Sequence, residues 1–460
     1  MDRPNFICIL MDDMGYKDLG CYGSSFYETP NLDAFAAGGV RFTDAYASCP
    51  VCSPTRASWM TGRYPARVGL TNYIGGNERG RVIGAPYTKY LPLTEKTVAR
   101  SLKDAGYQTW HVGKWHLGPE DYWPEKHGFD VNVAGCRWGC PANGYFSPWG
   151  NPRLEDGPDG EYLTDRMTEE AIRLIEGAGD QPFYLNLCYY AVHTPIQSKA
   201  EHVERFAAKA KSLGLDAAKT FEEGEHFRCE HKRDQRVVRR LIQSDPAYAA
   251  MMWSVDENIG KLLAALAASG KAGNTVIFYT SDNGGLATAE GSPTCNAPLA
   301  EGKGWMYEGG TREVLLARAP GVTTAGETCD VPVTSTDFYP TMLELAGLPA
   351  EPEHHCDGVS MVPLLNGAGR LEREAIFWHY PHYGNQGGTP GCSLRAGDHK
   401  LIEFLEDGRL ELYNLREDPS EDRNLADETP ELAGELHAKL VAWREDVGAT
   451  IPKPNPEWTA

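Results

Sequence analysis

Two pairs of oxygen-bearing side chains each follow directly after an apolar run. Asp12 and Asp13 come after residues 5–11, and Asp282 and Asn283 come after residues 275–280. Three carboxylates and one amide oxygen are hard ligands, which suit Ca²⁺ better than a soft metal. One such pair after a strand is more often a turn or a helix cap, but two pairs at equivalent positions predict a calcium site.

The segment from Cys52 to Gly62 combines a nucleophile with the signals of a short helix. Pro54 suits a first helical turn, and Gly62 is a suitable residue to end the helix. Cys52 would then lie at the N-terminus, where the helix dipole favours an anion, and Arg56 would add a permanent charge nearby. The segment predicts an anion-binding loop with a nucleophile; a buried structural cysteine is the alternative.

The overall charge requires that any anion-binding site be locally basic. The formal net charge of −20 makes nucleic acid and anionic membranes unexpected partners. The basic run at 231–240 is interpreted as a solvated helix face. Candidates for a local cluster are Arg56, Lys114, His116, His193 and Lys303.

Apolar runs alternate with helical patterns through the first two-thirds of the chain. This alternation indicates α/β architecture: a large, mostly parallel sheet with helices on both faces. The carboxyl ends of parallel strands collect chemistry, so we expect Asp12, Lys114, His193 and Asp282 to meet at one site. The strand-like runs are 5–11, 108–112, 182–189 and 275–280, and the helical patterns are 97–105, 163–175, 248–268 and 335–345.

The pattern changes after a Pro- and His-rich stretch at 349–355. Short strand-like segments joined by turns precede a helical pattern at 430–443. We therefore expect a catalytic domain at 1–350 and a C-terminal α+β subdomain at 351–460, with a small antiparallel sheet and a closing helix. Its predicted strands are 376–380, 393–395, 400–404 and 411–415.

Several blocks together resemble one enzyme family. Cys52-Ser-Pro-Thr-Arg56 matches the C-x-P-S/T-R signature of the type I sulfatases, in the alkaline phosphatase superfamily. Further blocks that look like sulfatase motifs follow in the family's order: Gly113–Gly118, Ala191–Pro195, Thr280–Gly285, Gly302–Gly304 and Glu308–Gly310. The tail from Leu412 to Ala426 resembles the family's C-terminal subdomain, so the resemblance covers essentially the whole chain.

The resemblance implies a calcium-dependent sulfatase with an alkaline phosphatase-like fold. A maturation enzyme would oxidise Cys52 to formylglycine, whose hydrate attacks sulfur and later expels sulfate. The implied ligands of Ca²⁺ are the modified Cys52, Asp12, Asp13, Asp282 and Asn283. Arg56 would steady the nucleophile and the metal site, His116 would handle the proton of the nucleophile, and Lys114, His193 and Lys303 would bind sulfate. Either His193 or Lys303 would protonate the leaving oxygen.

An aromatic segment at 378–383, which includes His379 and His382, suggests where the substrate is selected. Aromatic and histidine side chains suit the faces and hydroxyls of a sugar, although interdomain packing is the alternative. The Gly-rich loop at 384–391 and the aromatic loop at 136–149 are further candidates for the rim. We favour an exo-acting carbohydrate sulfatase, because an acidic surface suits a closed pocket better than a groove for a long polyanion.

Two other functions remain open. A phosphodiesterase or phosphonate monoester hydrolase would share the scaffold, the metal and the nucleophile. A sugar-sulfate binding protein would result if Cys52 were never converted.

The cysteine pattern bears on chemistry and location. Cys49, Cys52, Cys136 and Cys140 could in principle form a zinc site, and Cys49 with Cys52 could form a redox pair. Cys49 is also close enough in sequence to trap Cys52 as a disulfide before maturation.

No apolar run approaches the roughly 20 residues of a membrane helix, and no export signal is evident. We therefore expect a cytoplasmic protein, or a periplasmic or secreted one if a signal has been removed.

Overall fold

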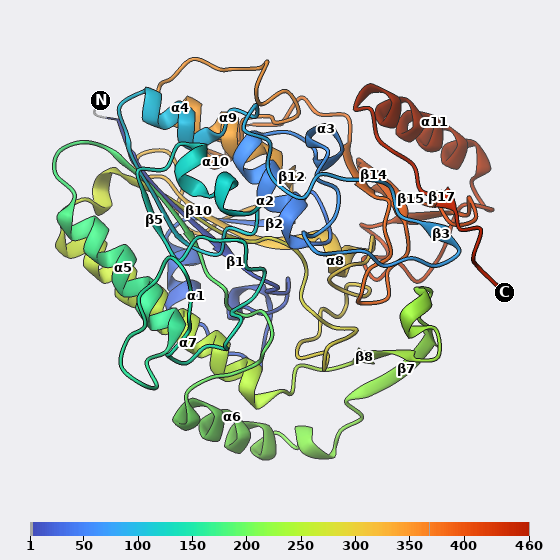
Figure 1. Ribbon diagram of the computed structural model, residues 1–460, viewed down its shortest axis with the longest axis horizontal. Coiled ribbons are helices and arrows are strands. Elements are labelled where there is room, and N and C mark those ends of the chain that lie inside the picture. Colours follow the sequence, from blue (N-terminus) through green and yellow to red (C-terminus); the bar gives the residue numbers. More distant parts are fainter. Residues whose placement is uncertain (1–2, 368, 460) are drawn as a thin grey trace.

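The computed structural model describes residues 3–367 and 369–459. Its centre is a nine-stranded sheet in the order β11-β2-β10-β9-β1-β6-β4-β5, with β12 beside β2 (Figure 1). In this sheet β10 is antiparallel to β9 and β2, whereas the remaining pairings are parallel. The strands are β1 (Asn5–Met11), β2 (Val40–Tyr46), β4 (Gln108–Gly113), β5 (Val131–Val133), β6 (Phe183–Cys188), β9 (Thr275–Ser281), β10 (Arg312–Arg318), β11 (Glu327–Cys329) and β12 (Val333–Thr334). The predicted mixed, mostly parallel sheet is confirmed.

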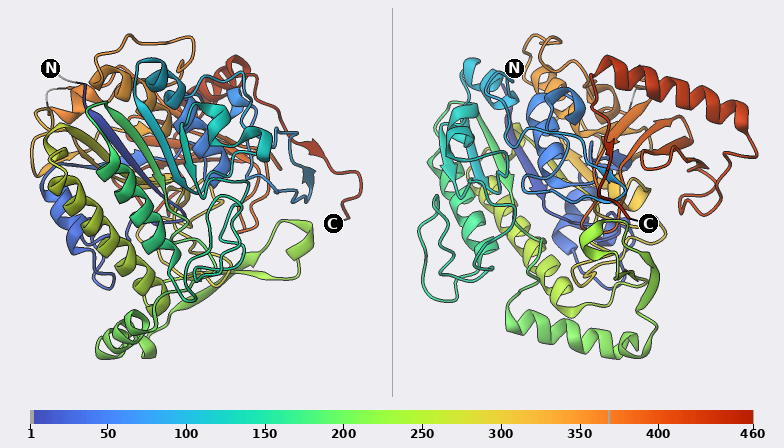
Figure 2. Two further views of the ribbon diagram at one scale, coloured as in Figure 1. Left: turned by 60° about the vertical axis from the view of Figure 1, so that its left-hand side comes forward. Right: turned by 45° about the vertical axis from the view of Figure 1, so that its right-hand side comes forward.

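The central strand β1 shows why the sheet needs cover on both faces. All seven of its residues are buried, and alternate side chains enter different apolar clusters. Ile7 and Ile9 contribute to the cluster of α1 (Pro30–Ala37), α5 (Leu163–Gly177) and α7 (Pro246–Ala268), which lie along one face (Figure 2). Cys8 and Leu10 contribute to the opposite cluster, formed with α2 (Cys52–Thr61), α4 (Val98–Asp104), α9 (Phe338–Leu345) and α10 (Val362–Leu365). The two clusters place the sheet in the middle of a helix–sheet–helix sandwich.

A smaller four-stranded antiparallel sheet follows near the C-terminus. Its strands are β13 (Ile376–Tyr380), β14 (Gly391–Ala396), β15 (His399–Phe404) and β16 (Leu410–Asn414). Leu394, Leu401 and Leu412 pack against α11 (Pro430–Asp446) on one face. Trp378 and Ile402 pack on the other face against residues beside α2 and β2. The sheet is therefore held against the main body, and its β13–β14 connection approaches the site described below.

The remaining elements are short or peripheral. They are α3 (Pro65–Val68), α6 (Ala200–Ser212), α8 (Glu308–Thr311), the pair β3 (Val82–Ile83) with β17 (Lys453–Pro454), and the hairpin of β7 (Phe221–His226) with β8 (Arg236–Arg240). Among the described residues, no helix has both the length and the apolar character needed to cross a membrane.

The basic run at 231–240 is not a helix face, and that prediction is wrong. Its second half is strand β8, in which Val237 is buried while its neighbours Arg236 and Val238 are exposed. Arg239 pairs with Glu225 and Glu301, and Arg240 pairs with Asp245. Pairing with β7 and with nearby carboxylates therefore accommodates the charges in an extended conformation.

Candidate active site

The parallel strands bring the polar residues that follow them to one edge of the sheet. Asp12 follows β1 and donates its N–H to Ala191 O beyond β6 (3.0 Å), and Asp282 after β9 donates to Met11 O (3.1 Å). Lys114, after β4, donates its N–H to Cys188 O at the end of β6 (2.8 Å). These backbone bonds hold the four strand ends in register and place the predicted residues within one site.

Helix α2 brings the predicted nucleophile to the same edge. Cys52 is its first residue, and Gly62 ends the helix in the left-handed conformation, at φ 64°. Every residue of α2 is buried. Cys52 Sγ lies 3.3 Å from His116 Nδ1, and the other ring nitrogen of His116 lies 3.2 Å from Ile74 O. The histidine is thus oriented towards the predicted nucleophile.

Basic side chains pair with the acidic ones of the site. Lys114 Nζ donates to Asp12 Oδ2 (2.7 Å) and Lys303 Nζ donates to Asp13 Oδ2 (2.8 Å). Arg56 Nε donates to Asp282 Oδ2 (2.8 Å). All six side chains are at most 7% exposed, so their charges interact in a poorly screened environment.

The oxygen donors of the site fit a hard cation. Asp12 Oδ1 and Asn283 Oδ1 are buried and have no hydrogen-bond partner among the described residues. Asp13 adopts φ 62°, a strained conformation for a residue with a side chain. Buried, unpaired oxygens beside two further carboxylates match the ligands that Ca²⁺ prefers, so Asp12, Asp13, Asp282 and Asn283 would be able to hold it.

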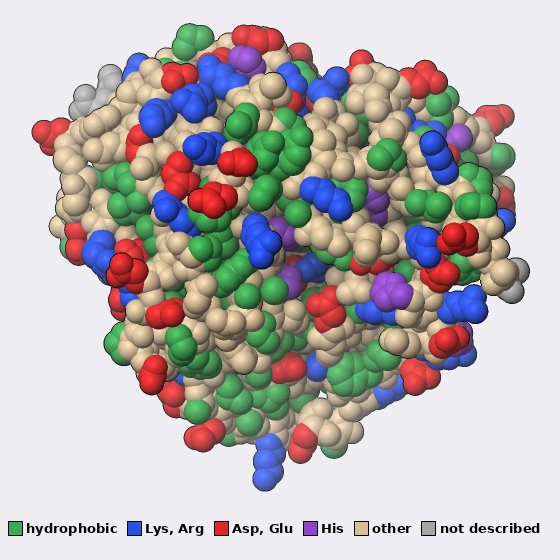
Figure 3. Space-filling view, viewed as in Figure 1, with side chains coloured by type: hydrophobic (Ala, Val, Ile, Leu, Met, Phe, Trp, Pro, Cys, Tyr) green, Lys and Arg blue, Asp and Glu red, His purple; other side chains and the backbone are tan. Residues whose placement is uncertain are grey.

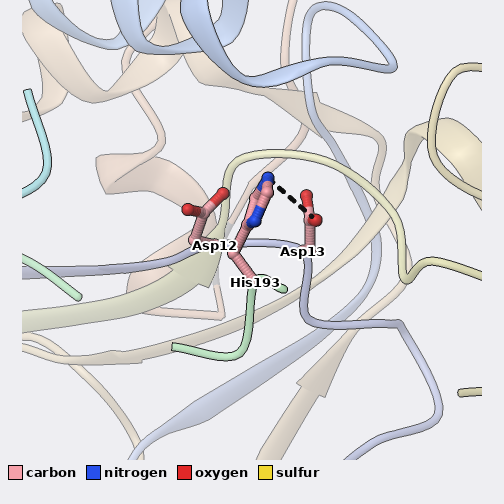
Figure 4. Close-up of side chains that lie close together, drawn as sticks. All are labelled: Asp12, Asp13 and His193. Carbon is pink, nitrogen blue, oxygen red and sulfur yellow. Dashed lines mark ion pairs between the residues drawn. The ribbon is translucent and has the colours of Figure 1, made fainter. Parts of the chain in front are cut away.

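His193 also faces this cluster. Its Nε2 lies 3.6 Å from Asp13 Oδ2 and 3.1 Å from Lys303 Nζ. Figure 4 shows its ring between Asp12 and Asp13, and the three residues offer ligand atoms within 4.8 Å of one another. The sequence predicted His193 as a sulfate-binding group, and its position beside the carboxylates would add a contact to a bound cation.

Burial and the neighbouring cations act in opposite directions on the pKa values of Asp12 and Asp13. Burial raises the pKa of Asp12 to about 8, although Lys114 opposes the shift. Burial also raises the pKa of Asp13, but Lys303 and His193 outweigh it and leave this pKa below its usual range. Burial and the neighbouring Lys303 lower the pKa of His193 to about 4. The chain's own cations therefore compensate the charge of Asp13 fully, but that of Asp12 only in part.

A cavity of about 610 Å³ opens above the predicted nucleophile. Figure 3 shows a hollow near the centre of this face, with histidine and basic side chains inside it. Cys52, His116 and Lys303 are buried and line its deep part, whereas Lys89, Arg137 and Glu290 are exposed. Trp138, Cys140, Asn385 and Gln386 also line it, from the two loops that the sequence proposed for the rim. Sequence reasoning missed Tyr73, Lys89 and Glu290, whose local sequence carries no signal of a site.

His379 and His382 do not line this cavity. His379 is buried, with Nδ1 2.9 Å from Cys392 Sγ and Nε2 2.9 Å from Thr450 O. His382 is buried against Tyr87 and Tyr380, with Nε2 2.9 Å from Thr71 Oγ1. Both rings make packing contacts, because their backbone positions direct them into the protein.

The cysteines do not form the alternative zinc site. In the described part of the chain, the one group of metal-ligating His, Cys, Asp or Glu side chains is Asp12, Asp13 and His193. Cys49 packs in the apolar cluster beneath the small sheet, and both Cys49 and Cys52 are free thiols. Burial raises the pKa of Cys49 well above its usual range.

Comparisons with known proteins agree with this geometry. The sulfatase family model matches residues 4–348, and the model of the C-terminal region of N-sulphoglucosamine sulphohydrolase matches residues 301–446. Arylsulfatase A of Bos taurus is 33% identical over 469 residues, covering 94% of this chain and 85% of that protein. N-acetylgalactosamine-6-sulfatase of Sus scrofa is 32% identical, covering 82% of this chain and 68% of that protein.

A solved structure extends the similarity to the whole fold. The crystal structure of Ps i-CgsB in complex with k-i-k-neocarrahexaose superposes with a TM-score of 0.77 and 28% sequence identity. The match covers 99% of this chain and 95% of that one. The fold is alkaline phosphatase-like, as predicted. The chain belongs to the sulfatase family and is a sulfuric ester hydrolase.

Proposed function

We propose that this sulfatase releases sulfate from the end of a sulfated saccharide, using a formylglycine made from Cys52 and a bound Ca²⁺. The observation that carries the proposal is the position of Cys52. It lies at the N-terminus of α2 and lines a cavity, 3.3 Å from His116 and beside buried oxygen donors that fit a hard cation.

The two added groups have limited roles in the proposal. Formylglycine would supply a hydrated aldehyde as the nucleophile, and Ca²⁺ on Asp12, Asp13, Asp282 and Asn283 would polarise the sulfate. The chain supplies the rest. His116 Nδ1 faces position 52 and can accept the proton of the nucleophile, while Lys114 and Lys303 offset the negative charge of the reacting group.

The leaving oxygen needs a proton, since the net reaction adds water to the sulfate ester and gives an alcohol and sulfate. His193 Nε2 and Lys303 Nζ lie 3.1 Å apart, and both residues line the cavity. A proton given to the leaving oxygen by one of them can therefore be replaced by the other. This arrangement supports the proposal that the His193–Lys303 pair is the general acid.

Three features support a saccharide end as the substrate. The cavity of about 610 Å³ suits one or two sugar residues rather than a long chain. Tyr73 and Trp138 line it and offer aromatic faces, and Asn385 offers an amide oxygen for a hydroxyl group. N-acetylgalactosamine-6-sulfatase, a relative by sequence, is named for a sulfated sugar. The proposed partners are thus a sulfated saccharide and a maturation enzyme that converts Cys52.

The test is sulfate release from a panel of sulfated mono- and oligosaccharides and an aryl sulfate. The protein is co-expressed with a formylglycine-generating enzyme, and conversion of residue 52 is followed by mass. We expect turnover that Cys52→Ala abolishes and that chelation of Ca²⁺ removes. Chelation should also lower the melting temperature of the wild type, because a bound ion stabilises the folded state.

The panel also separates the two rival functions. Turnover of phosphate diesters or phosphonates, with none of sulfate esters by the converted enzyme, would favour the phosphohydrolase. An unconverted Cys52 in a protein that binds sulfated sugar would favour the binding protein. Greater activity on intact polymer than on oligosaccharides would contradict action at a chain end.

A further inference from the structure

We propose that the cavity binds a second anionic group of the substrate, a sulfate or a carboxylate, through Lys89 and Arg137. The inference rests on the proposed function, because it concerns the same substrate. It narrows the substrate class to saccharide ends that carry two negative charges.

Lys89 and Arg137 are distinguished from the other exposed basic residues of this chain by their position. Both are exposed and line the cavity that contains Cys52. With 44 basic against 64 acidic residues, carboxylates are plentiful, and Arg239 for example contacts both Glu225 and Glu301. Within residues 3–367 and 369–459, neither Lys89 nor Arg137 has an ion pair or a side-chain hydrogen bond. Two unpaired cations therefore face the substrate space of an acidic protein.

Their backbone positions are held to the loop of the predicted catalytic histidine. Leu91, two residues after Lys89, donates its N–H to Leu117 O (2.9 Å). On the other side, His116 donates its N–H to Cys136 O (3.1 Å), next to Arg137. The Lys89 and Arg137 side chains therefore extend from segments that are fixed to adjacent residues of one loop. The distance between their backbone and the reaction centre is thus held constant.

The other charged groups of the cavity are already engaged. Lys303 is paired with Asp13 and belongs to the site of sulfate hydrolysis. Glu290 accepts hydrogen bonds from Asn385 (3.1 Å) and Gln386 (3.0 Å), and its charge repels an anion. A second anionic group would consequently be attracted to Lys89 and Arg137, and away from Glu290.

The number of cations limits the substrate. Two cations more than balance the single negative charge of one sulfate ester or carboxylate beyond the reacting group, whereas the acidic surface repels a long polyanion. A disulfated sugar and a sulfated sugar next to a hexuronic acid both meet this description. Because the cations are exposed, we expect each to improve binding by roughly two- to fivefold and to lose this effect at high salt.

The experiment compares matched substrates with the matured enzyme. A monosulfated hexosamine is measured against the same sugar with a second sulfate, and against the same sugar linked to a hexuronic acid. Lys89→Gln, Arg137→Gln and the double variant are tested, with the exposed Lys211→Gln on α6 as a control for the loss of a positive charge.

We expect the wild type to prefer a doubly charged substrate through a lower KM, and the double variant to reduce the ratio of kcat/KM values by roughly four- to 25-fold. Lys211→Gln should leave this ratio unchanged. The arm with the larger effect identifies the second group as sulfate or carboxylate. An equal loss on singly and doubly charged substrates, or no preference in the wild type, overturns the inference.

Binding provides a measurement that does not depend on turnover. In a Cys52→Ala background, calorimetry should show weaker binding of the doubly charged sugar when Lys89 and Arg137 are replaced. If the matured enzyme hydrolyses singly charged esters but the second anion does not change the affinity for the sugar, only this inference fails. If no sulfate ester is hydrolysed, the proposed function fails, and the titration still tests the two cations.

Discussion

At the scale of single residues, Arg56 connects the helix of the nucleophile to two strand ends. Its Nε donates to Asp282 Oδ2 (2.8 Å), and its Nη1 donates to Lys114 O (3.0 Å). The guanidinium is a rigid planar donor, so it orients both partners at once. A buried ion pair of this kind contributes more to geometry than to stability, because desolvation offsets its attraction.

Replacing Arg56 with lysine keeps the charge but removes this geometry. A lysine cannot donate in two fixed directions, so Asp282 would lose its orientation as a metal ligand. We expect Arg56→Lys to weaken calcium affinity about tenfold, with a parallel loss of kcat. Calcium titrations followed by melting temperature check the first effect, and an unchanged affinity would contradict this role of Arg56.

We expect the buried imidazole of His111 to make the folded protein less stable in mild acid. Burial lowers its pKa to about 3, and its ring contacts Gly113 O and Asn186. The unfolded chain takes up the proton as the pH falls below about 6.5 while the folded protein does not, so stability is full above that pH and declines towards pH 3. The slope from this residue alone is roughly 1.4 kcal/mol per pH unit.

Urea unfolding at pH 7 and pH 5 measures this effect. The difference between the two free energies of unfolding should shrink by about 2 kcal/mol in His111→Gln. The exposed His226→Gln is the control and should preserve the difference. An identical pH dependence in wild type and His111→Gln would show that His111 is not the titrating group.

At the scale of elements, the position of α2 depends on the glycine that ends this helix. Gly62 adopts φ 64°, and a Cβ there would approach His355 Cβ to 2.5 Å and Tyr339 Cβ to 3.2 Å. The glycine thus satisfies both a left-handed backbone and a close contact with the segment after α9. Because Cys52 is at the other end of the same helix, a shift at Gly62 reaches the nucleophile.

Replacing each of two glycines with alanine separates the cost of a left-handed backbone from the cost of the close contact. Gly270 has φ 74° but open space around it, so Gly270→Ala should cost only the backbone strain of about 1 kcal/mol. Gly62→Ala adds overpacking and should cost about 3 kcal/mol and reduce activity. Urea unfolding measures both variants, and equal costs would mean that the segment at His355 yields without penalty.

At the scale of the whole molecule, a buried charge cluster joins the small sheet to the main one. Lys400 on β15 contacts Glu308 on α8 (2.9 Å) and Glu421 (3.0 Å), and all three side chains are fully buried. Glu308 also accepts a hydrogen bond from Tyr46 on β2 (2.8 Å). The cluster therefore connects β15 of the small sheet to α8 and to β2 of the main sheet.

Lys400→Met should disrupt this connection. It leaves two buried carboxylates without their shared cation, which we expect to cost about 4 kcal/mol in the free energy of unfolding. The more exposed pair of Lys439 and Glu374 provides the control, and Lys439→Met should leave the urea midpoint nearly unchanged. A stability of Lys400→Met close to that of the wild type would contradict a structural role for the cluster.

Local sequence was sufficient to predict an element wherever burial or turn chemistry determines its residue types. β1, β4, β6 and β9 are apolar runs because both of their faces are covered, and they lie within two residues of the predicted bounds. β2 and β10 escaped prediction, since Arg41, Asp44 and Arg312 give them a polar appearance. Arg312 pairs with Glu308 on α8 and with Asp44 across the sheet, so only tertiary contacts make these strands favourable.

Tertiary contacts also decide to which side of the small sheet His379 points. On β13 the alternation of side chains places Trp378 and Tyr380 in the cluster against the main body. His379 therefore faces the opposite side and contacts Cys392. Which face of a short strand meets the core depends on sheet register, and sequence reasoning had no access to that register.

The amino-acid sequence alone was enough to predict the fold class, the family and the residues at the strand ends. Those features depend on local periodicity and on short motifs such as Cys52–Arg56. The folded chain completed the rim of the cavity, because Lys89 and Glu290 join the two predicted loops, which carry Arg137 and Asn385, from segments far apart in sequence. Such segments meet only through packing and backbone hydrogen bonds between loops, so the full set of side chains around the cavity emerges only in the tertiary structure.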